Sequence, residues 1–176
     1  KKLGNVHFEA TIVLNLSGVA LKSGDYETYK TYAERSLQLH QQIGSLEGQA
    51  IGLRALAKYH LFKKDFIAAK KLAVQAWEIA EKNKFRAEHA WASTLMANIA
   101  FAEGEMQTGE KYYQQSYDTL IRMVNDLLSE RSANLEKKYE TEKKETQIKQ
   151  LRAEQEVQQL SLRQKNILNA FLIGGV

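Results

Sequence analysis

Residues 46–82 decide the fold, and they read LEGQAIGLRALAKYHLFKKDFIAAKKLAVQAWEIAEK. Apolar side chains recur at helical spacing in the first part, which predicts a helix over residues 46–62. The polar tripeptide at 63–65 predicts a tight turn. The following part predicts a second helix over residues 66–82, because three alanines recur on one of its faces, Ala69, Ala73 and Ala76. Small residues let two helices approach closely, so the stretch predicts a helical hairpin.

The same pattern occurs three times along the chain, at a spacing of 40 residues. The turn tripeptides align, and so do a column of alanines, a column of large apolar residues and two columns of small residues. The aligned sets are Gly24-Asp25-Tyr26, Lys64-Asp65-Phe66 and Gly104-Glu105-Met106; Ala10, Ala50 and Ala90; Leu16, Leu56 and Met96; Ser17, Ala57 and Ala97; and Ser36, Ala76 and Ser116. Repeats of this kind indicate stacked supersecondary units.

The composition predicts an all-α fold. The 176 residues include no proline and few glycines, and proline is the strongest helix breaker. The lack of cysteine excludes disulfides, thiol catalysis and cysteine-ligated zinc. The net charge is +4, but both signs are scattered, whereas nucleic-acid-binding proteins gather Lys and Arg on one face. We therefore expect no nucleic-acid partner. No apolar run of a signal peptide follows the first three residues.

The repeated unit resembles the tetratricopeptide repeat. The matching positions are a large residue, a Leu followed by a small residue, the turn, and two later small positions. They are Val13, Leu16, Ser17, Gly24, Asp25 and Tyr26; Leu53, Leu56, Ala57, Asp65, Phe66, Ala69 and Ala76; and Met96, Ala97, Gly104 and Ser116. The resemblance implies a solenoid of helical hairpins over residues 1–120.

Some features depart from the tetratricopeptide pattern. The period is 40 residues rather than about 34, the terminal proline is missing, and Tyr29 and Gly109 occupy the column of small residues that usually precedes the aromatic one. A HEAT-type array is the structural alternative. Leu3-Gly4 aligns with Ile43-Gly44, which closes a second helix, so we expect residues 1–3 to be the end of an earlier repeat.

A long helix is predicted after the third turn, because no proline and only one glycine occur between residues 107 and 171. Its charged part, residues 121–166, carries two Glu-before-Lys pairs four residues apart, Glu140 with Lys144 and Glu145 with Lys149, which support an exposed helix. An irregular apolar stripe follows, made of Ile148, Leu151, Val157, Leu160, Leu162, Ile167 and Phe171. It predicts either a homodimeric coiled coil or a single solvated helix.

Residues 167–176 are mostly apolar, ILNAFLIGGV. A membrane span needs about 20 such residues, so we interpret the run as the first part of a span, which would anchor the chain to a membrane. The alternative is a hydrophobic tail that caps the coil or packs on a neighbour.

The whole layout is similar to the sensor half of tetratricopeptide-containing histidine kinases of the Bacteroidetes type. The resemblance implies that the repeats lie in the periplasm, that the chain is anchored in the inner membrane of a Gram-negative bacterium, and that it binds a protein or peptide. It would then relay a signal along the long helix to a kinase or a DNA-binding regulator. The alternative functions are a protein–protein interaction scaffold and the sensor of a membrane-anchored transcriptional regulator.

No catalytic, metal-binding or cofactor-binding constellation occurs in the sequence. The four histidines are scattered and none has metal-ligand spacing. Carried over from the family, the peptide-binding groove positions are Asn15, Arg54, Lys58, Phe62, Trp91 and Asn98. Arg54 and Lys58, four residues apart, are predicted to present two cations to a carboxylate. Trp91 is alternatively a core residue.

Overall fold

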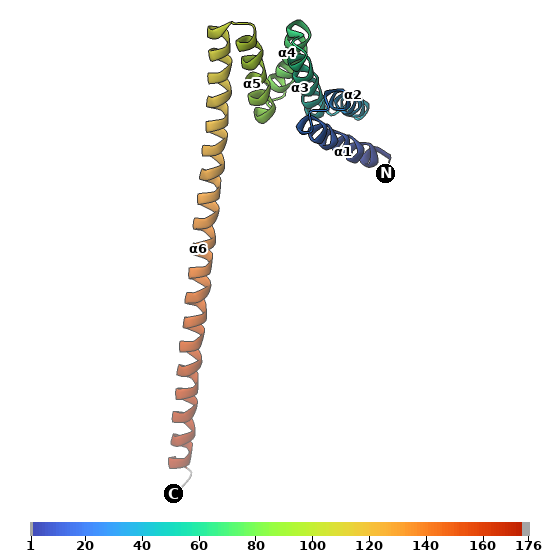
Figure 1. The fold of residues 1–176 in the computed structure, drawn as a ribbon. Helices are drawn as coiled ribbons and strands as arrows, with labels where there is room; N and C mark the ends of the chain where they lie inside the picture. Colours follow the sequence, from blue (N-terminus) through green and yellow to red (C-terminus); the bar gives the residue numbers. More distant parts are fainter. Residues whose placement is uncertain (1, 174–176) are drawn as a thin grey trace. The chain divides into compact units, whose positions relative to one another are not determined.

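The computed structural model describes the backbone of residues 2–173 and the side chains of residues 6–167. Within this part the chain is all-α (Figure 1). The helices are α1 (Lys2–Lys22), α2 (Tyr26–Gln42), α3 (Leu46–Phe62), α4 (Phe66–Lys82), α5 (Arg86–Ala102) and α6 (Met106–Ile173). The predicted hairpin of residues 46–82 is therefore confirmed as α3 and α4, with the expected ends. From α1 to α5, each helix packs on the next one along the chain.

The turns recur every 20 residues, twice as often as the sequence pattern. Each contains one residue with a left-handed backbone, and the φ angles are 75°, 68°, 59°, 58° and 82° at Gly24, Gly44, Lys64, Lys84 and Gly104. Three of the five are glycines because this region disfavours a Cβ atom. The next residue caps the helix that follows in three turns: Asp25 accepts from the Thr28 N–H at 3.0 Å, Ser45 from Gly48 at 3.2 Å and Asp65 from Ala68 at 3.1 Å.

Small residues form the contact surfaces between the helices. Ala33, Ala69, Ala73 and Ala97 are fully buried, which lets helix backbones approach closely. The column of Ser36, Ala76 and Ser116 is buried in all three units. Its two serines make equivalent hydrogen bonds, from Ser36 Oγ to the Ala10 carbonyl (3.3 Å) and from Ser116 Oγ to the Ala90 carbonyl (2.8 Å). The 40-residue alignment therefore corresponds to a structural equivalence.

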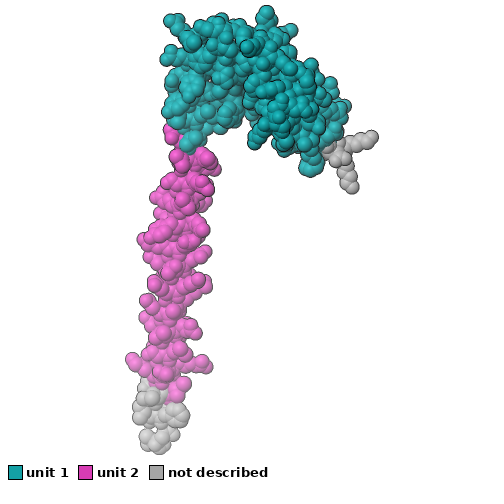
Figure 2. Space-filling model, in the orientation of Figure 1, with its two compact units in different colours: residues 1–124 teal, residues 125–176 magenta. Residues whose placement is uncertain are grey.

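The chain divides into two compact units, residues 1–124 and 125–176 (Figure 2), whereas the sequence predicts the end of the repeat array at residue 120. In the second unit every described side chain, from residue 125 to 167, is exposed. An ion pair there joins Lys138 and Glu142 at 3.9 Å. Neither predicted pair, Glu140–Lys144 or Glu145–Lys149, comes within the 4.0 Å of an ion pair, because these fully solvated side chains gain little from pairing.

The predicted start of a membrane span, residues 167–176, lies almost wholly outside the described side chains. Among the described residues, none of the helices has an apolar stretch of the length that a membrane crossing requires.

Candidate protein-binding face

Five of the six predicted groove residues lie on two helices that contact each other. Arg54, Lys58 and Phe62 follow one another at four-residue spacing and share one face of α3. Trp91 and Asn98, seven residues apart, share one face of α5. We call these five residues, together with Glu88 of α5, the α3–α5 face. Asn15 is exposed on α1, and no hydrogen bond or ion pair joins its described side chain to the other five.

An ion pair joins the two helices of this face. Arg54 Nε lies 3.1 Å from Glu88 Oε2, and the two side chains are 28% and 12% exposed. The protein thus supplies its own carboxylate to Arg54, one of the two cations that the sequence predicts for ligand binding. The pair fixes α3 against α5 and leaves Lys58 as the uncompensated charge.

Lys58 lies beside an aromatic cluster. Its Nζ is 5.8 Å from the centre of the Phe62 ring, within the range of a cation–π interaction. The Phe62 ring in turn lies 5.1 Å from the Tyr26 ring of α2. Phe62 is nevertheless 44% exposed, so much of its apolar surface faces solvent.

Trp91 is 47% exposed, and the alternative that it belongs to the core is wrong. The core position on this turn of α5 is taken by its neighbour Ala92, which is 1% exposed. Asn98, two turns further along, is also exposed. The α3–α5 face thus combines two half-exposed aromatic residues, a lysine, an amide and a partly buried ion pair.

A second set of contacts, which the sequence did not indicate, holds the corner between α2 and α3. Glu27 accepts a hydrogen bond from Tyr59 Oη at 3.0 Å and pairs with Lys63 Nζ at 2.9 Å. The hydrogen bond from Lys63 lowers the pKa of Glu27 and raises that of Lys63. Glu27 and Lys63 are 36 residues apart, so no local spacing pattern could reveal them.

The repeat geometry matches a known domain. The crystal structure of the TPR domain of Arabidopsis FLU is similar to this chain with a TM-score of 0.58, over 66% of this chain and 98% of that chain. This chain has a tetratricopeptide-type fold. At 16% identity, the likeness concerns the fold alone. No family model and no curated protein sequence matches the chain.

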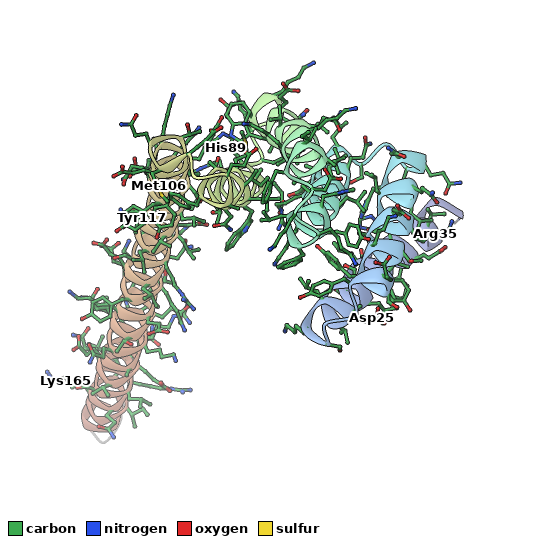
Figure 3. The ribbon with its side chains drawn as sticks, turned by 45° about the horizontal axis from the view of Figure 1, so that its top comes forward. Asp25, Arg35, His89, Met106, Tyr117 and Lys165 are labelled. Atoms are coloured by element: carbon green, nitrogen blue, oxygen red, sulfur yellow. The ribbon has the colours of Figure 1, made fainter. Side chains whose placement is uncertain are left out.

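The tetratricopeptide unit also has an open depression of about 590 Å³ beside α4, α5 and α6. It is lined by Ala80, Glu81, Lys84, Arg86, His89, Gln115, Thr119 and Arg122. Within it, His89 Nε2 lies 3.0 Å from Glu81 Oε2 and 3.4 Å from Gln115 Nε2 (His89 is labelled in Figure 3). His89 thus contacts an acidic and an amide side chain in this depression, whereas the half-exposed aromatic residues Phe62 and Trp91 lie on the α3–α5 face.

The other three histidines have separate surroundings. His60 Nδ1 lies 3.1 Å from Asp65 Oδ2, and the rings of His7 and His40 meet edge to face at 6.3 Å. His40 is buried, and neither of its ring nitrogens has a hydrogen-bond partner among the described residues. No cluster of three or more metal-ligating side chains occurs in the part of the chain that the structure describes.

Proposed function

We propose that this chain is a protein-binding tetratricopeptide module, whose α3–α5 face takes a segment of a partner protein. The observation that carries the proposal is a half-exposed aromatic residue on each of two helices joined by the Arg54–Glu88 ion pair, Phe62 with Lys58 beside its ring on α3 and Trp91 on α5. Tryptophan is enriched among the residues that dominate binding energy at protein interfaces.

The chemistry of the face indicates what the segment carries. Fully burying an aromatic side chain stabilises a complex by roughly 1.5–3 kcal/mol, so Trp91 and Phe62 favour an apolar side chain in the partner. Lys58 adds one positive charge that no acidic residue of the face neutralises, since Glu88 is paired with Arg54. We therefore expect a segment that combines an apolar residue with an acidic one.

A display library of random unstructured peptides tests this function. Peptides selected on the wild-type chain are expected to bind Trp91→Ala at least tenfold more weakly, a loss of about 1.4 kcal/mol, and Lys58→Glu more weakly still at low salt. Fluorescence anisotropy with a labelled peptide measures the change.

Matched variants control for general effects. Lys71→Glu makes the same charge change at an exposed lysine of α4, and Tyr139→Ala removes an exposed aromatic residue from the second unit; both should bind as the wild type does. A library that yields no binder, or binders unaffected by either change on the face, would contradict the proposal.

A second candidate function is more specific. We also propose that the chain is the sensor and dimerisation segment of a membrane-anchored two-component signalling protein of the histidine kinase type, or of a membrane-anchored transcriptional regulator. What supports it is the resemblance of the layout and the exposure of apolar residues along α6. Leu151, Leu160 and Leu162 are 58%, 55% and 60% exposed, as expected for a helix that pairs with a second copy. The inner-membrane location with periplasmic repeats belongs to this proposal.

Sedimentation equilibrium tests the dimer. We expect the wild-type chain to dimerise with increasing concentration, and Leu151→Lys with Leu160→Lys to weaken the dimer at least tenfold because two charges enter the contact. The control is Gln150→Lys with Gln159→Lys, which adds the same charge at polar positions. If the wild-type chain stays monomeric at every concentration, the dimer proposal fails and α6 is a single solvated helix. Peptide binding by the α3–α5 face would be unaffected by this outcome.

A further inference from the structure

A histidine is buried in the contact between α2 and α3. His40 is 5% exposed, and its ring lies against the backbone of Gly48, since a Cβ atom added to this glycine would overlap the ring. Neither ring nitrogen has a hydrogen-bond partner among the described residues. Buried polar side-chain atoms are hydrogen-bonded in the large majority of cases, so this unpaired imidazole is an exception.

The packing of the array does not require an imidazole at this position. Forty residues further along, the position equivalent to His40 is Ala80 of α4, which is 0% exposed, and the position equivalent to Gly48 is Glu88 of α5. In one unit the small residue is on the first helix of the contact, and in the next unit it is on the second. The contact between α2 and α3 is therefore distinguished by a buried side chain that can take up a proton.

The surroundings of His40 favour its neutral form. Burial lowers the pKa of the ring, and the positive charge of His7 on α1, whose ring lies 6.3 Å away, lowers it further. From α3 the ring meets Gly48, which has no side chain, and the acidic residue of that helix, Glu47, is exposed.

The carboxylates of α1 and α2 neutralise other cations. The ion pairs are Glu9 with Arg35 at 2.7 Å, Glu34 with Lys30 at 3.7 Å, and Glu27 with Lys63 at 2.9 Å. Among the described residues, no ion pair joins a carboxylate to His40. A proton on its ring would therefore bring a positive charge into a buried site without a negative charge to balance it, which is costly.

The other polar contacts between α2 and α3 keep their charges at mildly acid pH. Tyr29 Oη donates to the Ala55 carbonyl at 2.9 Å, and burial raises the pKa of Tyr29 to about 12. The hydrogen bond between Lys63 and Glu27 lowers the pKa of Glu27 and raises that of Lys63. His40 is thus the buried group of this contact whose charge changes between about pH 5 and 8.

We propose that the contact between α2 and α3 is an acid-operated switch, which is closed while His40 is neutral and opens when the ring takes up a proton at mildly acid pH. The folded chain binds this proton less readily than the unfolded chain. The contact therefore contributes its full stability above the ordinary histidine pKa of 6.5, and it loses stability progressively as the pH falls below that value. Opening also separates Tyr26 of α2 from Phe62 of α3, whose rings lie 5.1 Å apart.

Urea denaturation of the full chain at pH 8 and at pH 5 tests the switch. Between these two conditions, the folding equilibrium constant of the wild type should fall about tenfold more than that of His40→Leu, because leucine takes up no proton. Leucine is the residue at the aligned position of the third unit, Leu120. His40→Gln is a second variant that keeps a polar side chain, and it should show the same reduced pH dependence.

His60→Gln is the matched control. His60 Nδ1 lies 3.1 Å from Asp65 Oδ2, so the charged form of this histidine has a partner, and the variant should lose at least as much stability in acid as the wild type does. Hydrogen exchange at pH 5 locates the opening. The amides of residues 36–40 and 48–56 should exchange faster in the wild type than in His40→Leu, by a larger factor than the amides of α5.

Proton NMR measures the titration directly. The ring signals of His40, assigned as those that His40→Leu lacks, should titrate below 6.5. Two results would overturn the proposal: an equal loss of stability in acid for the wild type and both His40 variants, or titration of His40 at or above its ordinary pKa. None of these measurements uses a ligand, so this inference and the proposed function can fail independently.

Discussion

Replacing Ile99 by alanine is expected to destabilise the tetratricopeptide unit by about 2–5 kcal/mol. Ile99 is 1% exposed and is one of the largest fully buried side chains among the described residues. It packs with Ala69 and Ala73 of α4, whose methyl groups cannot move far enough to fill the space that a lost isoleucine leaves. The cost therefore includes a cavity in addition to the lost burial. Urea denaturation followed by circular dichroism measures the change in the free energy of unfolding.

The control for this prediction is Ile67→Ala. It removes the same atoms from a side chain that is 85% exposed, and its effect should stay within about 0.5 kcal/mol. Equal losses for the two variants would contradict the packing described for α4 and α5.

Replacing Gly48 by leucine is expected to cost about 1–3 kcal/mol or more, because an added side chain overlaps the His40 ring. The second change, His40→Ala, should recover part of this loss in the double variant, since it removes the obstacle. Burial, with a smaller contribution from nearby His7, lowers the pKa of His40. The ring is therefore neutral at pH 8, where thermal unfolding of the single and double variants should be compared.

Gly18→Leu is the matched control for the second prediction. Gly18 also lies inside a helix, but a Cβ atom added there meets nothing within 4 Å. Leucine favours helix over glycine by up to about 1 kcal/mol, so this variant should be as stable as the wild type or more stable. If Gly48→Leu behaved in the same way, or if His40→Ala recovered nothing, the close approach of α2 and α3 would be disproved.

Much of the fold could be predicted from the sequence. The hairpin of residues 46–82 has the predicted ends because its alanine spacing and turn residues are local signals. The 20-residue recurrence of the turns was missed, since Lys84-Phe85-Arg86 shares no residue type with Gly44-Ser45-Leu46, although the left-handed residue and its place are the same. Backbone geometry is repeated there without repetition of the side chains.

Helical spacing predicts which of the candidate residues share a helix face, but not which residues they contact. Helical spacing places Arg54 and Lys58 on one face, and the structure agrees. The partner of Arg54 is Glu88, 34 residues away, and pairing over such a distance depends on how α3 and α5 pack. The exposure of Trp91 depends on the same packing, because Ala92 takes the buried position on that turn.

The packing of α1–α5, each against the next helix along the chain, has a consequence for cooperativity. The stability of such an array is approximately a sum of terms for single units and for adjacent pairs. α3 contacts α2, α4 and α5, so the opening of this helix has to break its contacts with three others. A ligand that contacts both α3 and α5 would add a favourable free-energy term that links two neighbouring repeats. These two repeats would then unfold together.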